Sequence, residues 1–372
     1  MNIKRAHHIK YFQRCLQCLP SRFAGYDQQR VNILFFVLSG LESLDAIDKL
    51  DPNIKSQIID WLYESVMNET KSGFLPSTSL NKLMKDSHIT MTYCALICLL
   101  ILDDDLKRLK PHRIIAALGD FQSETGAISA TPEGETDLRF TFCAVAIYYI
   151  LQGHKFPTKF SPDKAAEYIY QCQTYEGGFA QKPFLEAHGG STFCAVSSLL
   201  LLKKEVPNKQ KLIKWLCAKQ DRLVDADFPA SGFSGRSNKV PDSCYTFWIG
   251  SSLKMLNAED LIDEEALENF LRDCQSDYGG FSKWRNMNTP DPLHSSLSLL
   301  GAGVFDFEWA EETFAPLSCS KRVYDKIQCL EFEELKLKEI KVKELSYRFE
   351  KEIMASLAVG LLSWAVYMSF SK

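Results

Sequence analysis

The chain has 372 residues, of which 46% are hydrophobic and 24% are charged, a composition typical of soluble globular proteins with one or two domains. Its 43 Lys and Arg residues against 47 Asp and Glu residues give a net charge of −4, which provides no long-range positive field and excludes nucleic acid as an expected partner. The twelve cysteines are scattered and the N-terminal segment lacks the apolar core of a secretory signal, so we expect a reduced, cytoplasmic protein.

A CxxC pair stands near the start of the chain, formed by Cys15 and Cys18. No second pair follows at metal-binding spacing, and no βαβ pattern surrounds it. We therefore expect two buried structural thiols at these positions.

A short motif, Thr followed by an aromatic residue, recurs in register along the chain. Copies begin at Thr92, Thr141, Thr192 and Thr246, and a looser copy begins at Ser296, so the gaps are 49, 51, 54 and 50 residues. This period predicts one helix–turn–helix unit per repeat.

A second element lies between the copies, in which a Gln precedes a glycine turn and an apolar residue. It spans Gln122 to Ile128, Gln173 to Phe179 and Gln275 to Phe281, and Gln220 to Phe233 is the same element with an insertion. Glycine suits the left-handed conformation at a helix end, and the segments between show apolar residues at 3.6-residue spacing. Strand-like alternation is nearly absent, so the expected fold class is all-α.

Five or six helical hairpins of this length can stack as an open solenoid or close into an α/α barrel, and the period alone does not distinguish the two. The aromatic and small residues at the start of each inner helix favour closure, because in a ring they would line one central cavity. We expect that cavity to be deep and apolar.

The repeat pattern ends near residue 320. We therefore expect a barrel domain over 1–320, a charged helical linker over 321–352 and an apolar tail over 353–372. The apolar run Ile353 to Phe370 is slightly shorter than the roughly 20 residues needed to span a bilayer, and serines interrupt it. A membrane anchor, a docked helix and a gene-model artefact all stay open, and with them membrane contact of the tail.

The segment GRSNKVPDSCY places Arg236 and Lys239 ahead of Asp242 and Cys244 at the start of a repeat helix. Alone, this pattern also suits a solvent-exposed helix start with an Asp N-cap. One repeat later, His294 stands at the equivalent helix start, where a ring-shaped fold would bring it beside Cys244. Asp, Cys and His are zinc ligands, and three protein ligands leave open the fourth position of a catalytic site. A substrate thiol could fill that position.

A second cluster is His188-Gly189-Gly190, in which the paired glycines allow close approach of the backbone to a ligand. Helix N-termini bind anions, although His188 alone is equally explained as a helix cap. The corresponding corner of the next repeat carries Arg236, Lys239 and Tyr245. Together these residues predict a diphosphate pocket, and the aromatic cavity beside it suits a prenyl chain.

The sequence resembles the β-subunits of protein prenyltransferases over roughly residues 5–305, with the repeats and all three zinc-ligand motifs in order. The matching motifs are Phe12 to Leu16, Leu38 to Leu41, His188 to Cys194 and Asp242 to Tyr245. They look most like the geranylgeranyltransferase type I branch, and less like the farnesyl and Rab enzymes.

The resemblance implies a six-hairpin α/α barrel of the terpenoid cyclase and protein prenyltransferase type, with one Zn²⁺ per β-subunit on Asp242, Cys244 and His294. The diphosphate contacts that it implies are His188, Gly189, Gly190, Arg236, Lys239 and Tyr245. It also implies that Trp248 lines the isoprenoid cavity, and that Arg139 and His88 lie along the bound peptide.

Two positions distinguish the branches of this family. Asn32 aligns with a bulky Trp that shortens the cavity of the farnesyl enzyme, so a smaller residue leaves room for a C20 chain. Lys283 stands where the farnesyl enzyme has a magnesium-binding Asp, so a lysine would neutralise diphosphate and Mg²⁺ would not be required.

The implied activity is transfer of a geranylgeranyl group from geranylgeranyl diphosphate to the cysteine of C-terminal CaaX motifs of the CaaL type, through a zinc-bound thiolate. Tyr245 and Lys283 would assist departure of the diphosphate. The implied partners are a prenyltransferase α-subunit, in a heterodimer, and CaaX proteins such as Rho/Rac-type small GTPases.

Alternatives are a farnesyltransferase or Rab geranylgeranyltransferase β-subunit, and a non-catalytic toroid scaffold in which the three ligands serve as caps and core residues. The sequence departs from the family in an insertion at 221–230, a short loop near 70–87 and an unfamiliar tail.

Overall fold

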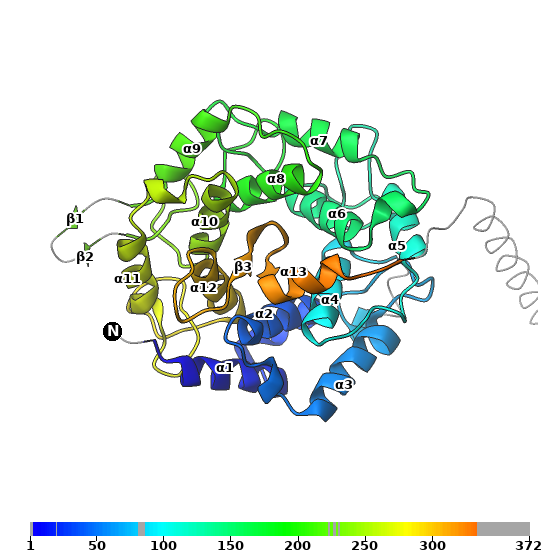
Figure 1. Ribbon diagram of the computed structural model, residues 1–372, viewed down its shortest axis with the longest axis horizontal. Helices are drawn as coiled ribbons and strands as arrows, with labels where there is room; N and C mark the ends of the chain where they lie inside the picture. The colour runs from blue at the N-terminus through cyan, green and yellow to red at the C-terminus, as the bar shows by residue number, and fades with distance from the viewer. Residues whose placement is uncertain are drawn as a thin grey trace, which may run out of the picture.

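Twelve helices alternate between an outer and an inner ring in the computed structural model, which describes residues 3–19, 21–80, 86–221, 224–225, 228–229 and 231–332. The outer helices are α1 (Arg5–Gln17), α3 (Pro52–Asp60), α5 (Pro111–Ala117), α7 (Pro162–Gln171), α9 (Lys209–Cys217) and α11 (Glu264–Cys274). The inner helices are α2 (Arg30–Glu42), α4 (Ile89–Ile101), α6 (Leu138–Ile150), α8 (Gly189–Leu201), α10 (Tyr245–Met255) and α12 (Pro292–Val304). Each outer helix precedes an inner one, so these helices form six hairpins, where the period predicts five or six and the family resemblance implies six (Figure 1).

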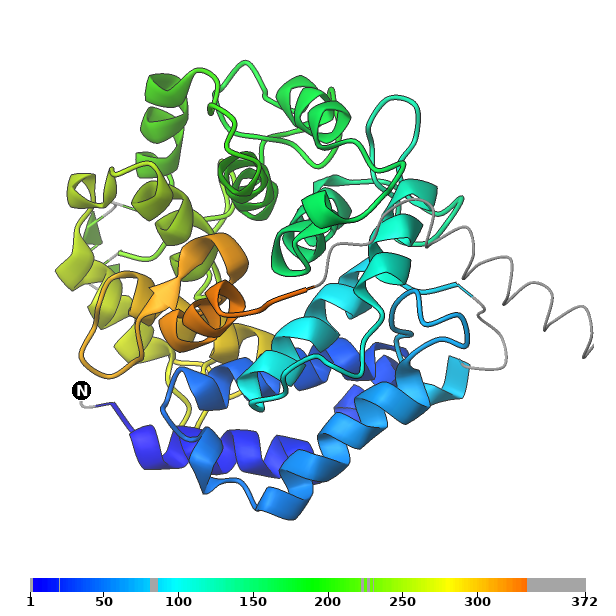
Figure 2. The same cartoon turned by 45° about the vertical axis from the view of Figure 1, so that its right-hand side comes forward.

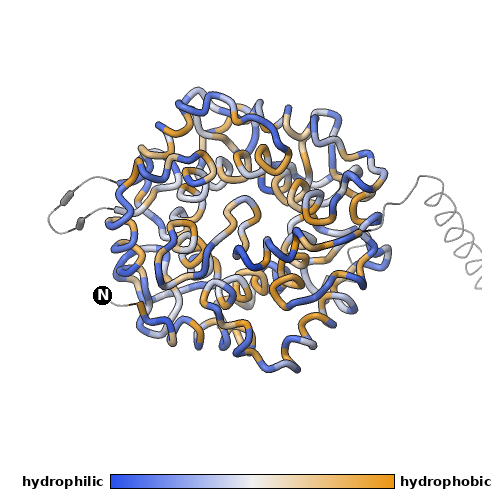
Figure 3. The backbone as a smooth tube through the Cα atoms, viewed as in Figure 1, coloured by the Kyte–Doolittle hydropathy of each residue, from blue (hydrophilic) through white to orange (hydrophobic). Residues whose placement is uncertain are grey.

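The inner ring is closed. Each inner helix packs against the next, and α12 packs against α2, so the open solenoid is excluded (Figure 1). The inner helices are apolar almost throughout, and in α4 every residue from Met91 to Ile101 is buried. Figure 3 shows this arrangement as hydrophobic inner helices and a more hydrophilic periphery. Burial of a helix on all sides requires such a sequence, whereas the outer helices keep a polar face.

The Gln of the second recurring element joins each repeat to the next. The side chain of Gln122 donates to the carbonyl oxygen of Ser161 at 2.9 Å and accepts from its N–H at 2.7 Å. Gln220 makes the same two bonds with Asp263, at 2.8 and 2.9 Å. Ser161 and Asp263 are the N-caps of α7 and α11, so one amide holds the start of the following outer helix.

His8 of α1 closes the ring at the junction of the first and last repeats. Its Nδ1 accepts the N–H of Gly280 at 2.9 Å, and its Nε2 lies 3.0 Å from Oε1 of Gln275. Because a backbone N–H can only donate, Nδ1 carries no proton, and Nε2–H donates to Gln275. Burial lowers the pKa of His8 to about 4. Gly279, with φ of +89°, lies so close to the backbone of His7 that any side chain would collide with it.

The segment after α12 closes one end of the ring (Figures 1 and 2). It contains the antiparallel pair β3 (Thr313–Phe314) and β4 (Cys319–Ser320), followed by α13 (Lys321–Gln328). Tyr93 donates to the carbonyl oxygen of Leu317 at 2.8 Å, and Ser197 donates to that of Pro316 at 2.5 Å. The segment therefore binds inner helices on both sides of the ring.

The segments that the sequence separates from the barrel are described only in part. The expected linker over 321–352 begins with α13, where Arg322 binds buried Glu42 at 2.6 Å, while its remainder beyond 332 and the tail over 353–372 lie outside the described residues. The insertion contains an antiparallel pair of β1 (Val224–Asp225) and β2 (Phe228–Pro229). Among the described helices, none combines the length and the apolar character required to cross a membrane.

A candidate metal centre and its surroundings

The candidate residues gather at one end of the ring because all inner helices run in the same direction. The loops that enter neighbouring inner helices contact one another at that end, as in the pairs His188–Tyr245 and Asp242–His294. Their N-cap residues are His88 for α4, Asp137 for α6, His188 for α8, Cys244 for α10 and Asp291 for α12. Helix starts from neighbouring repeats thus supply one site jointly.

Asp242, Cys244 and His294 lie together, as their positions at neighbouring helix starts predict. One ligand atom from each residue can be chosen so that all three lie within 4.8 Å of one another. Oδ1 of Asp242 lies 3.3 Å from Nε2 of His294 and accepts the N–H of Cys244 at 3.0 Å. Asp242 and Cys244 are buried and His294 is half-buried. A carboxylate, a thiol and an imidazole converging in this way can hold a divalent metal ion.

Asp291 orients His294, although the sequence analysis assigns it no role in the site. Its Oδ2 lies 2.6 Å from Nδ1 of His294, while its Oδ1 caps α12 by accepting the N–H of the same residue at 2.9 Å. The ring is thereby fixed with Nε2 toward Asp242. Metal-binding histidines commonly donate their second nitrogen to a carboxylate. In the sequence, the only sign of this contact is an Asp that stands three residues before a His at an expected helix start.

The pKa values of the three residues reflect their burial and the charges that they place on one another. Burial lowers the pKa of His294, but Asp242 and Asp291 outweigh it and raise the pKa to about 9. Burial opposes ionisation of Asp242, yet the bond with His294 lowers its pKa. Burial and then the charge of Asp242 raise the pKa of Cys244 far above its ordinary value. The His294 ring thus lies between the carboxylates of Asp242 and Asp291, and binding of a metal ion at Nε2 would require loss of the proton there.

Cationic side chains stand beside these candidate metal ligands. Nζ of Lys283 lies 3.6 Å from Oδ2 of Asp242, and Arg236 pairs with Glu186 at 3.0 Å. The Lys283 and Arg236 side chains are 45% and 44% exposed, and Lys239 is exposed on the same loop as Arg236. These cations are therefore accessible to an anionic ligand.

His188 and Tyr245 form a hydrogen-bonded pair next to these cations. Nδ1 of His188 accepts the N–H of Gly190 at 3.1 Å, and Nε2 lies 2.9 Å from the Tyr245 hydroxyl. Burial and then the charge of Arg236 lower the pKa of His188, so the ring is neutral at neutral pH. Since Nδ1 is occupied as an acceptor, the proton lies on Nε2 and is donated to the Tyr245 oxygen. The phenolic proton of Tyr245 is then directed to another acceptor.

The Tyr245 ring lies directly against the backbone of two glycines, Gly189 and Gly235. A Cβ atom added to Gly189 would lie 3.0 Å from the Tyr245 ring, and one added to Gly235 would collide with it. Gly190 has more room, because its nearest neighbour would be the His188 ring at 3.4 Å. The prediction that Gly189 and Gly190 admit a ligand stays a prediction. The packing of Gly189 and Gly235 against Tyr245 was not foreseen from the sequence.

Aromatic residues of the recurring Thr motif form a continuous series across the inner helices. Tyr93 contacts Phe142 with ring centroids 5.3 Å apart, Phe142 contacts Phe193 at 5.4 Å, and Phe193 contacts Trp248 at 5.1 Å. These residues belong to α4, α6, α8 and α10 in turn. The repeat thus brings an aromatic surface to the ring interior. Of these four residues Trp248 is the least buried.

The remaining predicted site residues lie on α2, α4 and α6. Asn32 is half-buried in the first turn of α2. Arg139 binds the α6 N-cap Asp137 through Nε at 2.9 Å and stacks over Phe140 at 5.3 Å. His88 also contacts Phe140, edge to face with ring centroids 6.1 Å apart, and burial lowers the pKa of His88 to about 4. Arg139 and His88 therefore share one aromatic neighbour.

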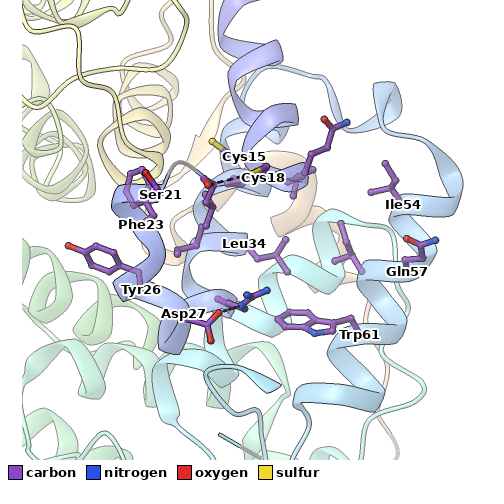
Figure 4. A pocket seen from close by; sticks show the side chains of 17 residues that line it. Cys15, Cys18, Ser21, Phe23, Tyr26, Asp27, Leu34, Ile54, Gln57 and Trp61 are labelled. Carbon is purple, nitrogen blue, oxygen red and sulfur yellow. Dashed lines mark hydrogen bonds and ion pairs between the residues drawn. The ribbon is translucent and has the colours of Figure 1, made fainter. Parts of the chain in front are cut away.

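A separate pocket of 810 Å³ lies between α1, α2 and α3, and none of the predicted site residues lines it (Figure 4). Its lining includes Cys15, Cys18, Leu34, Ile58 and Trp61. The expectation that both thiols of the CxxC pair are buried is wrong, because Cys15 is half-buried and Cys18 is exposed. Cys18 follows the last residue of α1, where the helix ends at the surface.

Comparisons with known proteins agree with the fold. The model of the prenyltransferase alpha-alpha toroid domain matches residues 3–341. The chain is 36% identical to the geranylgeranyl transferase type-1 subunit beta of Dictyostelium discoideum, over 85% of this chain and 95% of that protein. It is 32% identical to the protein of the same name from Arabidopsis thaliana, over 79% and 83%.

A farnesyl enzyme and a solved structure are also similar. The chain is 30% identical to the protein farnesyltransferase subunit beta of Schizosaccharomyces pombe, over 82% of this chain and 79% of that protein. The structure of Candida albicans protein geranylgeranyltransferase-I complexed with GGPP superposes with a TM-score of 0.81 at 25% identity, covering 90% of this chain and all of that one.

Proposed function

The chain belongs to the prenyltransferase alpha-alpha toroid family, and from this premise we propose that it is the catalytic β-subunit of a type I protein geranylgeranyltransferase. Such an enzyme transfers the C20 group of geranylgeranyl diphosphate to the cysteine of a C-terminal CaaL-type motif. The observation that carries the proposal is the convergence of Asp242, Cys244 and His294 beside exposed cations at one end of an aromatic ring interior.

In this proposal Asp242, Cys244 and His294 hold one zinc ion. The donor set is that of zinc sites, and Asp291 fixes the His294 ring with Nε2 toward Asp242. A bound zinc ion supplies a Lewis acid that lowers the pKa of a coordinated substrate thiol from about 8.5 to below neutral.

The cationic residues bind the diphosphate in this proposal. In the reaction a sulfur–C1 bond forms, the bond from C1 to the diphosphate oxygen breaks, and negative charge grows on that oxygen. Tyr245 donates its phenolic proton to it, because His188 already donates to the phenol oxygen. Arg236, Lys239 and Lys283 balance the charge on the outer oxygens, and with Lys283 in place Mg²⁺ is not required.

The aromatic series of the inner helices receives the prenyl chain. Each buried methylene contributes about 0.8 kcal/mol to binding, so the affinity for the prenyl diphosphate comes from the aromatic ring interior. The rate of transfer depends on the polar residues at the end of the ring, which act on the departing diphosphate. Asn32, at the start of α2, leaves the volume that a C20 chain needs. The peptide lies across Arg139 and His88, near the start of α6 and α4.

The partners in this proposal are a prenyltransferase α-subunit and CaaX proteins such as Rho/Rac-type small GTPases, and the reaction takes place in the cytoplasm. The support is the type-1 subunit beta name carried by two relatives that cover most of the chain. A subunit of this kind is expected to need its partner for activity.

Single-turnover transfer tests the proposal. The full chain, co-expressed with an α-subunit, is mixed with a CaaL peptide and either a C20 or a C15 diphosphate donor. We expect transfer with a preference for C20, and loss of transfer in Cys244→Ala. Preference for C15 would indicate the farnesyl branch, and absence of transfer with intact donor binding would leave a scaffold.

A further inference from the structure

Lys219 is nearly buried, although a lysine side chain ordinarily keeps its amino group in water. It stands two residues after the end of α9, and only 5% of its surface is exposed. Burial lowers the pKa of Lys219, while the charges of Glu176 and Glu186 act in the opposite direction. None of the ion pairs among the residues that the structure describes includes Lys219, so no direct pair offsets the cost of burying it. A costly buried group of this kind is expected where function requires it.

Lys219 binds the loop that carries Arg236 at two points. Its carbonyl oxygen accepts the N–H of Ser234 at 2.9 Å, and its Nζ donates to Oγ of Ser237 at 3.1 Å. Arg236 lies between these two serines, and Lys239 stands two residues after the second. Any residue at position 219 could make the backbone bond, whereas the bond to Ser237 depends on the amino group. The side chain of Lys219 therefore fixes the part of the loop that presents the two exposed cations.

Trp215 of α9 supports the Lys219 side chain. The centre of its ring lies 4.6 Å from Nζ of Lys219, and the ring itself is buried. The same ring occupies the space beside Gly178, where an added Cβ atom would lie 2.8 Å from it. Because the ring is held by this packing, the amino group rests on a fixed aromatic face, and such a contact favours its charged form.

The ion pair of Arg236 is a weak support for this loop. Arg236 pairs with Glu186 at 3.0 Å, and the two side chains are 44% and 51% exposed. An ion pair so open to water contributes little stability. It must also open when a diphosphate takes the place of the Glu186 carboxylate. The bond from Lys219 to Ser237 involves neither side chain of the pair, so it holds the loop while this exchange takes place.

We propose that Lys219 is a positioning residue for the prenyl transfer, which holds Ser237 so that Arg236 and Lys239 are in place for the diphosphate of the donor. The inference rests on the proposed function and adds to it a residue outside the candidate site. A loop that is held in advance loses less conformational freedom when the ligand binds, so the donor binds more tightly. The same arrangement places positive charge where negative charge grows on the departing diphosphate.

Ligand binding to the full chain, co-purified with an α-subunit, tests the proposal. Lys219→Met keeps the length of the side chain and removes the donor, while Ser237→Ala removes the acceptor. Each variant should weaken the binding of geranylgeranyl diphosphate roughly tenfold and leave unchanged the binding of geranylgeraniol, which lacks the diphosphate. The melting temperature of Lys219→Met should not fall, because an apolar side chain avoids the cost of burying an amino group. Lys214→Met, at an exposed position of α9, is the matched control and should bind both ligands as wild type does.

The double variant should bind the diphosphate no more weakly than the weaker single variant, because both substitutions remove the same bond. Unchanged affinity in Lys219→Met, equal losses for the diphosphate and the alcohol, or additive losses in the double variant would each overturn the proposal. Failure of the proposed function gives a different result. A wild-type protein that binds geranylgeranyl diphosphate and transfers no prenyl group would refute the activity, while the contrast between the two ligands would still decide whether Lys219 holds the loop for the diphosphate.

Discussion

Nε2 of His188 lies 2.9 Å from the hydroxyl of Tyr245, and the two residues stand at the starts of neighbouring inner helices. The N–H of Gly190 occupies Nδ1, so the neutral imidazole can only donate to the phenol. The pair therefore acts as a unit in which His188 aims the proton of Tyr245. This arrangement makes a kinetic prediction.

Tyr245→Phe removes the directed proton and should slow the chemical step roughly 100-fold with little change in donor affinity. His188→Asn keeps an N-cap for α8 but is too short to reach Tyr245, so it should slow the same step without lowering the melting temperature. The double variant should be no slower than the slower single variant. Rapid-quench kinetics measure the step, and additive losses would refute the pairing.

Asp291→Asn tests the orientation of His294. The amide keeps a cap for α12 but can present its NH₂ group to Nδ1, which favours the tautomer that has its proton on Nε2. Zinc affinity should fall roughly 10- to 100-fold while the fold is retained. Competition with a chromogenic chelator gives the affinity, and circular dichroism controls for helix content. An unchanged affinity would show that Asp291 serves only as a cap.

Asn32→Trp tests the depth of the prenyl cavity. The larger side chain, in the first turn of α2, should exclude the last isoprene unit and shift the C20-to-C15 preference toward C15 by roughly 100-fold. Asn32→Thr is the matched control, because Thr is similar in size to Asn, and this variant should keep the C20 preference. Competition between the two donors measures the ratio directly. A C20 preference retained by the Trp variant would place the end of the cavity elsewhere.

His8 predicts a pH dependence of stability. Its pKa is lowered by burial from 6.5 to about 4, so the unfolded chain binds a proton that the folded chain does not. Above pH 6.5 His8 is neutral in both states and does not reduce the free energy of unfolding. As the pH falls from 6.5 toward 4, protonation of the unfolded chain lowers this free energy by roughly 3 kcal/mol. Urea unfolding at several pH values measures it.

His88 has the same lowered pKa, so the effect of His8 must be taken as a difference. His8→Gln should reduce stability at pH 7, because the bonds to Gln275 and Gly280 are altered, and should flatten the slope between pH 6.5 and 4. A variant with the wild-type slope would assign the pH dependence to other groups.

Sequence periodicity was sufficient to predict the hairpins because each repeat carries its own signals. The Gln elements were found as a pattern, and the structure supplies their reason: Gln122 and Gln220 bind the N-caps of following helices. The repeat period does not predict closure of the ring, because closure depends on contacts between α12 and α2 and between His8 and Gln275. Such contacts join residues far apart in the chain and leave no local pattern.

The convergence of Asp242, Cys244 and His294 was predictable because their types are chemically specific and they stand at equivalent helix starts. Asp291 and Gly235 were missed for opposite reasons. Asp291 has an ordinary explanation as a helix cap, which concealed its bond to His294. The need for Gly235 arises only from the ring of Tyr245 lying against it. Exposure of Cys18 was also missed, because burial depends on where α1 ends.

The most direct test of the central claim is the metal content of the full chain, co-purified with an α-subunit, in wild type and in Cys244→Ala. We expect one zinc per heterodimer in wild type and its loss in the variant. With cobalt in place of zinc, a CaaL peptide should intensify the sulfur-to-cobalt absorption, because a second thiolate joins that of Cys244. Wild-type protein without stoichiometric metal, or a cobalt spectrum unchanged by the peptide, would contradict the assignment of Asp242, Cys244 and His294 as the thiol-activating centre.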